Sequence, residues 1–249
     1  MRKIISSSLV VLGLTAAANA QFCGSGAGFA IPDNNPAGAS STINVPNNFA
    51  ITGIAVKINM SVNHSWIGDL IVTLTDPDGN TADLFRRVGV GIAGSTVGDS
   101  SNFAGGRFTT RGGVTNFADL NVPFPGCNAT NISLAPFGTP AGNLWSASGV
   151  SGAPAPTGAP GTADNVFNGD YVASSNSGAG STYADRYVEV NLMTLLAPGN
   201  SAGNWTLRIS DNAGADTGTV ASWQLQLLPE PTSLALVGLG VAALIRRRR

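Results

Sequence analysis

Residues 54–62 have the sequence IAVKINMSV, in which apolar side chains alternate with smaller or more polar ones. Successive side chains of an extended chain point to opposite faces, so one face of this stretch is wholly apolar. That face carries Ile54, Val56, Ile58, Met60 and Val62. A period of two is typical of a half-buried strand, and we predict a β-strand here.

Two further stretches near the C-terminal end alternate in the same way. Residues 205–209 (WTLRI) and 223–227 (WQLQL) each place three apolar side chains on one face, and a polar, glycine-containing loop separates them. Residues 70–75 form a continuous β-prone run that ends in the turn DPDG at 76–79, where Pro fixes φ and Gly tolerates positive φ. Residues 82–85 are predicted to return as the second strand of a hairpin.

Alternation is absent from residues 86–116 and 146–181, which are rich in Gly, Ser, Ala and Pro and are predicted to be long loops. Residues 187–192 are predicted to form one more strand. Between the two ends of the chain, no long stretch has the apolar period of a helix. Many short strands joined by turns predict an all-β fold, a jelly-roll-like antiparallel β-sandwich.

The N-terminal end has the layout of a secretory signal peptide. A basic start at residues 2–3 and an apolar middle precede the small residues Ala-Asn-Ala at 18–20. We predict a signal helix over residues 1–20 that a signal peptidase removes, which places the remaining chain in the envelope or outside a bacterial cell. A lipoprotein is excluded because Phe22, before Cys23, is too bulky for the small-residue site of a lipoprotein peptidase.

The C-terminal end combines a short motif, an apolar run and a basic tail. Pro229, Glu230 and Pro231 precede the apolar residues 233–245, and four arginines close the chain. A membrane-spanning helix needs about 20 residues, so this run is short for a permanent span, and the arginines favour the cytoplasmic side. Residues 229–249 resemble the PEP-CTERM sorting signal. The resemblance implies transient membrane insertion and an exosortase-type processing enzyme; a simple C-terminal anchor is the alternative.

Removing both ends leaves residues 21–228, a length suited to one β domain. This part keeps 7 of the 13 basic residues and 13 of the 14 acidic ones, because six basic residues and Glu230 lie in the ends. Its net charge is therefore −6, whereas that of the whole chain is −1. A surface that binds nucleic acid is basic, so nucleic acid is excluded as a partner.

Two separated motifs resemble the P domain, also called Homo B, which accompanies subtilisin-like proprotein convertases and many secreted bacterial proteases. Residues 62–74 contain a histidine and a tryptophan shortly before Gly-Asp-Leu opens a strand. Residues 203–212 (GNWTLRISDN), followed by DTG at 216–218, match the second half of the family pattern. The resemblance spans residues 31–228 and departs from the pattern over residues 120–182.

The P-domain resemblance implies a jelly-roll sandwich that binds or stabilises and carries out no chemistry itself. The residues agree with this, because the one histidine, His64, lies in no triad motif and no G-x-S-x-G elbow is present. One histidine and two distant cysteines exclude a histidine-based zinc site. The acidic residues leave a glycoside-hydrolase pair open, but no pattern singles one out.

Calcium is the predicted metal, because loop carboxylates and carbonyls suit a hard cation with six to eight oxygen ligands. Asp211 and Asp216 flank the loop between the last two predicted strands, and Asp69 lies in the first motif. Local hydrogen bonds to the backbone are the alternative role for these three carboxylates. Asp76 and Asp78 are weaker candidates, because forming the turn that they share accounts for them without a cation.

Two further predictions concern a disulfide and a ligand contact. Cys23 and Cys127 both lie in the exported part, where an oxidising compartment favours a disulfide; two unpaired thiols are the alternative. Trp145, in a loop, is the candidate for stacking on a sugar, whereas alternation places Trp205 and Trp223 in the core.

These observations predict a non-catalytic exported surface or matrix protein whose sandwich serves binding, adhesion or structure, with calcium as a stabiliser. Its partners would be the two processing enzymes and a glycan or matrix polymer. The first alternative is a carbohydrate-binding module, and the second is an accessory domain that acts with a separate subtilisin-like serine protease. An intrinsic hydrolase is the third.

Overall fold

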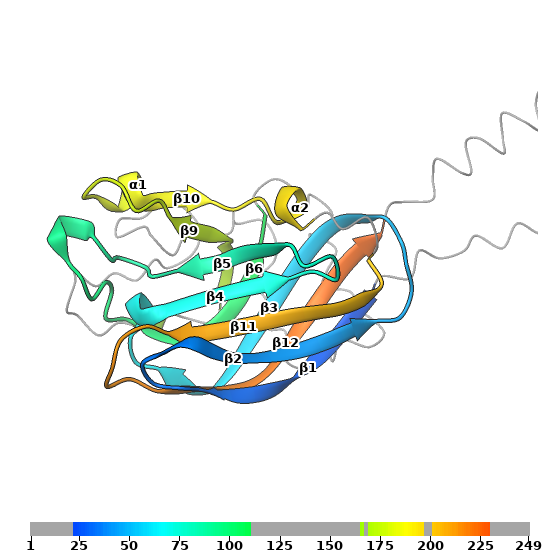
Figure 1. The fold of residues 1–249 in the computed structure, drawn as a ribbon, viewed down its shortest axis with the longest axis horizontal. Helices are drawn as coiled ribbons and strands as arrows, with labels where there is room; N and C mark the ends of the chain where they lie inside the picture. The colour runs from blue at the N-terminus through cyan, green and yellow to red at the C-terminus, as the bar shows by residue number, and fades with distance from the viewer. Residues whose placement is uncertain (1–21, 111–164, 167–168, 197–200, 230–249) are drawn as a thin grey trace, which may run out of the picture. The chain divides into compact units, whose positions relative to one another are not determined.

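The computed structural model describes residues 22–110, 165–166, 169–196 and 201–229 (Figure 1). Its strands are β1 (Phe22–Ile31), β2 (Asn35–Val45), β3 (Ile51–His64), β4 (Leu70–Thr75), β5 (Thr81–Arg86), β6 (Asn102–Thr109), β7 (Asn165–Val166), β8 (Gly169–Val172), β9 (Ser174–Asn176), β10 (Tyr187–Glu189), β11 (Gly203–Asp211) and β12 (Gly218–Pro229). Short helical turns are η1 (Ile67–Asp69), η2 (Ile92–Gly94), α1 (Tyr183–Arg186) and α2 (Leu192–Leu195). The described part of the chain is therefore mostly β.

Two sheets form the sandwich. One has the strand order β1-β12-β3-β6-β7, with β8 also paired to β6, and the other has the order β2-β11-β4-β5. Their strands pair antiparallel, except that β7 and β8 run parallel to β6. A smaller sheet pairs β10 with β9. Figure 1 shows the four-stranded sheet lying over the larger one, and the predicted all-β, antiparallel sandwich is confirmed.

The core lies between the two sheets and is built from the alternating residues of their strands. Both of the alternating stretches predicted near the C-terminal end are confirmed, as β11 and β12. Their six apolar side chains are fully buried: Trp205, Leu207, Ile209, Trp223, Leu225 and Leu227. The predicted hairpin is also confirmed, since β4 pairs antiparallel with β5. The core thus uses the faces of β11 and β12 that the alternation indicates.

Alternation in β3 holds for only part of the predicted stretch. Ile58 is fully buried, but Val62 is 54% exposed. The pairing of β3 with β6 is irregular between Asn59 and His64, and such a break changes the face that a side chain occupies. Lys57, which points away from the core, is also buried. Residues 54–58 of β3 are therefore buried on both faces, and the prediction of a half-buried strand is wrong for them.

Both predicted long loops contain strands. β6 lies inside residues 86–116, and β7, β8 and β9 lie inside residues 146–181. Gly105 and Gly106 make the composition of β6 resemble that of a loop, yet Phe103 and Phe108 of the same strand are buried in the core. Two buried aromatic side chains in one strand outweigh the low strand propensity of glycine.

The strand predicted over residues 187–192 is shorter than expected. β10 ends at Glu189, and the chain then enters α2. The Asn191 side chain accepts hydrogen bonds from the backbone N–H groups of Met193 at 3.0 Å and Thr194 at 3.1 Å. This N-cap satisfies donors that the first helical turn leaves without partners, and it favours the turn over an extended chain.

The predicted signal helix at residues 1–20 and the predicted C-terminal helix lie outside the described residues. The domain limits at residues 21 and 228 therefore stay predictions. Among the described residues, no helix has the length and apolar character needed to cross a membrane.

Candidate functional site

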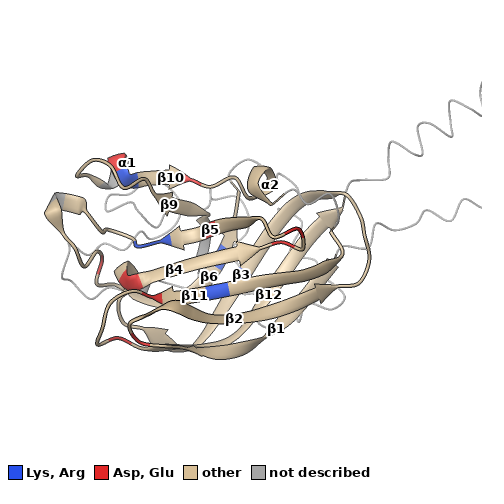
Figure 2. Ribbon diagram, in the orientation of Figure 1, with Lys and Arg blue, Asp and Glu red and all other residues tan. Residues whose placement is uncertain are grey.

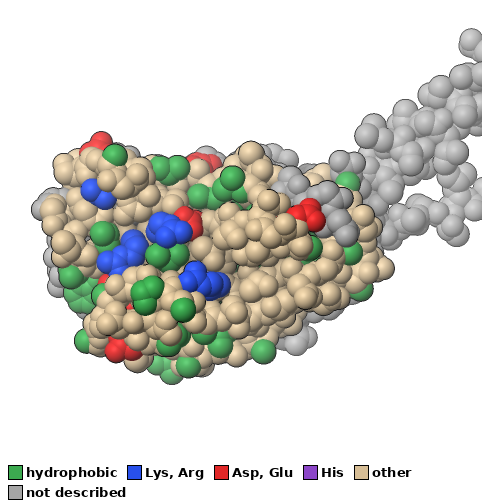
Figure 3. Space-filling view, viewed as in Figure 1, with side chains coloured by type: hydrophobic (Ala, Val, Ile, Leu, Met, Phe, Trp, Pro, Cys, Tyr) green, Lys and Arg blue, Asp and Glu red, His purple; other side chains and the backbone are tan. Residues whose placement is uncertain are grey.

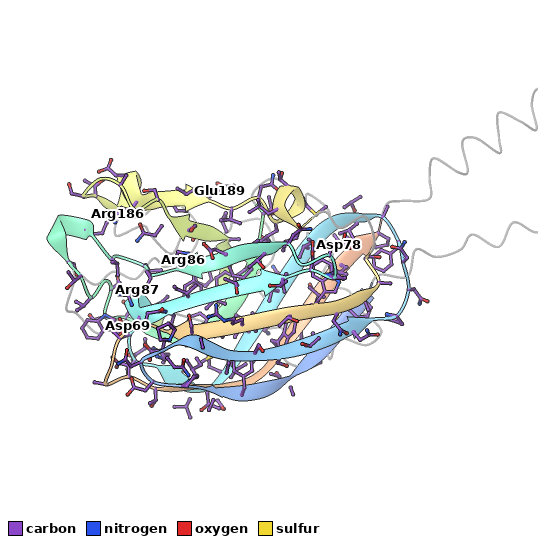
Figure 4. All side chains as sticks on the ribbon, in the orientation of Figure 1. Asp69, Asp78, Arg86, Arg87, Arg186 and Glu189 are labelled. Carbon is purple, nitrogen blue, oxygen red and sulfur yellow. The ribbon has the colours of Figure 1, made fainter. Side chains whose placement is uncertain are left out.

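Side chains from separate segments meet at one end of the sandwich. We call them the motif cluster: His64 at the end of β3, Asp69 in η1, Arg87 after β5, Asp211 at the end of β11, and Asp216 before β12. Strand pairing places Asp211 opposite Leu70, so β11 and β4 bring the two P-domain-like motifs together. Figure 4 shows Asp69 and Arg87 at this end of β4, and Figure 2 shows that acidic residues lie mainly at strand ends and in turns.

A buried pair of His64 and Asp211 forms the centre of the motif cluster. Both side chains are fully buried, and Nε2 of His64 lies 3.1 Å from Oδ2 of Asp211. Nδ1 of His64 lies 3.0 Å from the carbonyl oxygen of Trp66, and the backbone N–H of Ala213 donates to Oδ1 of Asp211 at 3.0 Å. Both ring nitrogens and both carboxylate oxygens therefore have partners within the protein, as buried polar groups require.

The His64–Asp211 pair lacks the third member of a catalytic triad among the described residues. The nearby hydroxyl of Ser65 donates to Oδ1 of Asp216 and makes no hydrogen bond with His64. A triad needs a nucleophile within hydrogen-bond reach of the histidine and access for a substrate. The geometry instead suits a structural role, in which the pair holds the end of β3 against the end of β11.

Asp69 of the motif cluster has a pKa that departs clearly from the ordinary value of an aspartate. Its Oδ1 lies 3.6 Å from NH1 of Arg87, which is beyond hydrogen-bond distance. Burial raises the pKa of the Asp69 carboxyl from 3.8 to about 6; Arg87 and His64 lower it, and the charges of Asp211 and Asp216 raise it. Burial outweighs the attraction of the arginine, so the folded chain favours the protonated acid more than the unfolded chain does.

Acidification from about pH 7.5 to about pH 5.5 is expected to stabilise the chain through Asp69 by about 1 kcal/mol. Because the folded-state pKa of Asp69 is the raised one, its contribution is complete below the unfolded pKa and is lost as pH rises through about 6. A domain of this size should then gain roughly 2–4 °C in Tm. An Asp69→Asn chain should lack this increment, and equal pH responses of the two chains would contradict the assignment.

Close approach of neighbouring segments explains two glycines of the motifs. A Cβ on Gly218 would lie 2.9 Å from Cβ of His64. A Cβ on Gly68 would lie 2.6 Å from both the backbone nitrogen of Asp99 and the carbonyl oxygen of Val97. Larger residues at either position would push apart segments that are in contact in the fold. The Gly-Asp-Leu and Asp-Thr-Gly motifs thus have a packing reason.

The three carboxylates predicted to bind calcium are brought into one cluster, but protein groups already engage them. Asp211 accepts from His64 and Ala213, Asp216 accepts from Ser65, and Asp69 faces Arg87. No group of three or more His, Cys, Asp and Glu side chains placed to hold a metal occurs in the described ranges. As arranged, these residues do not form a coordination shell, and calcium binding stays a prediction.

The weaker calcium candidates lie elsewhere. Oδ1 of Asp76 accepts from the backbone N–H groups of Asp78 and Asn80, both at 2.9 Å, and its Oδ2 accepts from the Asn80 side chain at 2.9 Å. This is a side-chain-stabilised turn. Figure 4 places Asp78 at the opposite end of the sandwich from Asp69, so the structure does not bring the two sets together.

The remaining predicted residues are only partly described. Cys23 is disulfide-bonded, and the chain contains one other cysteine, Cys127, which lies outside the described residues. Trp145, Glu230 and Pro231 also lie outside them, and Pro229 is the last residue of β12.

Sequence reasoning missed Arg87 and Asn212. Arg87 lies in a predicted loop, and no motif marks it. The Asn212 backbone N–H donates to the carbonyl oxygen of Asp69 at 2.9 Å, and its side-chain amide donates to the same oxygen at 3.1 Å. Asn212 is the last residue of the motif GNWTLRISDN, which was the signal available in the sequence. That motif alone does not show which carbonyl group Asn212 contacts.

Two parts of the chain match known protein families. Residues 169–227 match the family described as the proprotein convertase P-domain, and residues 228–249 match the PEP-CTERM protein-sorting motif. Both resemblances are confirmed. The P-domain match includes Asp211, Asp216 and Gly218 of the second motif, and it begins after the first motif.

Two similar solved structures are crystal structures of the serine protease of Aeromonas sobria, one of them in complex with the chaperone ORF2. Their identities to this chain are 12% and 13%, and the TM-scores are 0.35 and 0.36. Each comparison covers 84% of this chain but 27% of the protease chain. No curated protein matches this chain. The sorting motif indicates a bacterial protein exported to the cell envelope or surface.

Proposed function

We propose that this chain is a non-catalytic exported protein whose P-domain-like sandwich serves binding, adhesion or structure at the cell surface or in the extracellular matrix. The observation that supports this best is the motif cluster, because His64 and Asp211 of the two P-domain motifs are fully buried and paired with each other. Side chains that join two strand ends in this way stabilise a module and are not presented to a substrate. The sorting motif supplies the route to the surface.

Fractionation of the producing cells tests this proposal. The chain should be recovered from the envelope or the extracellular polymer, without hydrolytic activity on peptides or glycans. A chain with Glu230→Ala in the sorting motif should be held unprocessed in the membrane fraction. Recovery of the unaltered chain from the cytoplasm, or a purified chain that turns over a substrate, would rule the proposal out.

The carbohydrate-binding alternative has an observation of its own. Four threonines are aligned across the outward face of the smaller sheet and form what we call the threonine row: Thr42, Thr206, Thr75 and Thr81. Their hydroxyl oxygens lie 3.1 Å apart in the first pair and 2.8 Å apart in the last. Figure 3 shows that this face is largely uncharged, with arginines towards one end. Regularly spaced hydroxyls on a flat face suit a neutral, polyhydroxylated polymer.

Thr42→Glu is expected to lower retention on neutral cell-surface polysaccharide by about tenfold. A bound polymer would remove the new carboxylate from water without offering it a charged partner, and this cost opposes binding. Ser61→Glu is the matched control, because Ser61 is exposed on the other sheet. Sedimentation of the exported chain with insoluble polysaccharide measures both. Equal retention of the two variants would reject the threonine row as a binding face.

Calcium binding is proposed as a stabilising addition and is tested by a thermal melt. If the cation binds near Asp69, Asp211 and Asp216, the chain should melt several degrees higher in excess calcium than in excess chelator, because a ligand bound only by the folded state stabilises it. Asp69→Asn should reduce that difference. Equal melts would assign these carboxylates solely to the contacts with His64, Arg87 and Ser65.

The protease-accessory alternative draws on the P-domain match. It predicts that the exported chain co-purifies with a separate subtilisin-like enzyme and raises the thermal stability of that enzyme. A chain that elutes alone from the producing cells would speak against it.

A further inference from the structure

Arginine side chains gather on the outward face of the smaller sheet and on the segments beside it. Four residues form what we call the arginine patch: Arg86, Arg87, Arg186 and Arg208. The described ranges contain only two other basic residues, Lys57 and Arg107, and both belong to the larger sheet. Figure 3 shows lysine and arginine side chains together on one part of the visible surface, and Figure 4 places three of the four arginines near one another. Positive charge is therefore concentrated in one region.

Strand register places Arg208 and Arg86 on the same region of the smaller sheet. Arg208 lies between two core residues of β11, so its side chain points outwards. It pairs with Thr73 of β4, which pairs in turn with Asp83 of β5. Asp83 accepts hydrogen bonds from Nε and NH2 of Arg86 at 2.8 and 2.9 Å. The strands that carry the two arginines are therefore two strand spacings apart, roughly 10 Å.

The side chain of Asn176 links Arg186 to the segment that contains Arg87. Its Nδ2 donates to the carbonyl oxygens of Arg87 at 3.3 Å and Val90 at 3.1 Å. Its Oδ1 accepts from NH1 of Arg186 at 3.4 Å. Arg186 also packs closely on the backbone, because a Cβ on Gly91 would lie 1.9 Å from the guanidinium carbon. These contacts hold the guanidinium group in place, which lowers the entropy cost of binding a ligand.

Backbone carbonyl groups, which carry no net charge, orient Arg208 and Arg186. Nε and NH2 of Arg208 donate to the carbonyl oxygens of Ala37 and Pro36, the first at 2.8 Å. Nε of Arg186 donates to the carbonyl oxygen of Gly180 at 2.9 Å. In the part of the chain that the structure describes, neither arginine forms an ion pair with a carboxylate. A guanidinium group has five N–H donors, so both arginines keep donors and positive charge for a ligand.

Neighbouring acids compensate only part of the charge of the arginine patch. The other two arginines face carboxylates, Asp83 at 2.8 Å and Asp69 at 3.6 Å. Asp185, which precedes Arg186 in the chain, accepts hydrogen bonds from the backbone of its own loop at 3.1 and 3.3 Å. The patch therefore has fixed positive charges without paired carboxylates, and such a field attracts anionic ligands.

The threonine row lies next to the arginine patch on the same sheet face. Thr206 and Arg208 are two residues apart on β11, about 7 Å along the strand. The planar guanidinium group matches the geometry of a carboxylate, and the threonines offer hydrogen bonds to hydroxyl groups. Nucleic acids and anionic membranes are bound by larger sets of basic residues. A polysaccharide that contains carboxylated sugars fits both parts of this surface.

We propose that the arginine patch binds the carboxylate groups of an acidic polysaccharide while the threonine row contacts its hydroxyl groups. Arg208 and Arg186 supply the charges that have no paired carboxylate, and Arg86 and Arg87 add to the positive field around them. This proposal deepens the binding role proposed above and rests on it. It differs from the neutral-polymer alternative, in which the threonine row alone makes the contact.

Retention of the full exported chain on immobilised polygalacturonate tests the proposal. Polygalacturonate and its methyl-esterified form share one backbone, but only the first carries charged carboxylates. Retention should be at least about tenfold stronger on the acid than on the ester. It should also fall steeply between about 0.05 and 0.5 M salt, because salt screens exposed charges. Equal retention on the two polymers would overturn the proposal and favour a neutral glycan.

Arg208→Gln is expected to weaken retention on polygalacturonate about fivefold, and Arg186→Gln about as much, because each removes one exposed charge contact. Ser61→Asp is the matched control. It lowers the net charge by the same amount at an exposed position of the larger sheet, and retention should stay within about twofold because that charge is screened. If the control and Arg208→Gln weaken retention equally, overall charge and not the arginine patch governs binding.

Polyglutamate shows whether the carboxylates come from a polysaccharide or from an acidic polypeptide. Retention on polyglutamate as strong as on polygalacturonate would assign the patch to acidic polypeptides and overturn the proposal. A chain that binds none of the three polymers would also overturn it, whereas recovery of that chain from the envelope without hydrolytic activity would keep the proposed function. The comparison of polymers needs no variant, so it holds even if a substituted chain fails to fold.

Discussion

Asp211→Ala is expected to lower the free energy of unfolding by about 3 kcal/mol. The substitution removes the acceptor for Nε2 of His64 and for the backbone N–H of Ala213, and both Asp211 and His64 are fully buried. Water cannot replace the lost partner without opening the end of the sandwich, so the cost includes a buried donor left without a hydrogen bond. Urea denaturation of the exported chain, followed by tryptophan fluorescence, measures the change.

Asp216→Ala is the matched control for Asp211→Ala. Asp216 belongs to the same loop and accepts a hydrogen bond from Ser65, but it is only partly buried. Its loss should cost about 1 kcal/mol or less, because water can solvate the group left behind. If the two variants lose the same stability, the buried pair is not what holds β3 to β11, and the structural role assigned to the motif cluster fails.

Gly26→Val is expected to destabilise the chain by about 3 kcal/mol, at the upper end of overpacking effects. Gly26 is buried on β1 directly opposite Trp223, and a Cβ there would lie 2.0 Å from Nε1 and 2.6 Å from Cε2 of the indole. Trp223 is fully buried in the core. It cannot turn away without displacing its neighbours, so added atoms on β1 must separate the edge strand from β12.

Gly214→Ala controls for the general effect of replacing a glycine. A Cβ at that position meets Cβ of Asn34 at 3.9 Å, an ordinary contact, and stability should change by less than about 1 kcal/mol. Combining Gly26→Val with Trp223→Leu should cost less than the sum of the two single changes, because the smaller side chain makes room. Additive losses would mean that the glycine matters for another reason.

Local patterns in the sequence predicted much of the fold. Period-two alternation indicated β11 and β12, and the DPDG turn indicated the β4–β5 hairpin, because these features depend on residues close together in the chain. The two P-domain-like motifs were also recognisable, and the structure brings Asp69 and Asp211 of those motifs into one cluster. What these motifs do at the end of the sandwich was not predictable, because no pattern marks Arg87 and because the motif that contains Asn212 does not show which carbonyl group it contacts.

The strand β6 shows where sequence reasoning stops. Its glycine-rich composition indicated a loop, and only packing of Phe103 and Phe108 into the core explains why it is a strand. Likewise, the alternation in β3 showed that residues 54–62 have two faces, but not that Lys57 on the second face is buried.

The sequence by itself determined the class of fold, the C-terminal sorting motif and the residues that belong to the two P-domain-like motifs. Only the tertiary structure decided which strands are neighbours, that His64 pairs with Asp211, and that Lys57 on the second face of β3 is buried. The reason is that periodicity and turn chemistry act over a few residues. Burial, charge pairing and the pKa of Asp69 depend on groups that lie far apart in the chain until it folds.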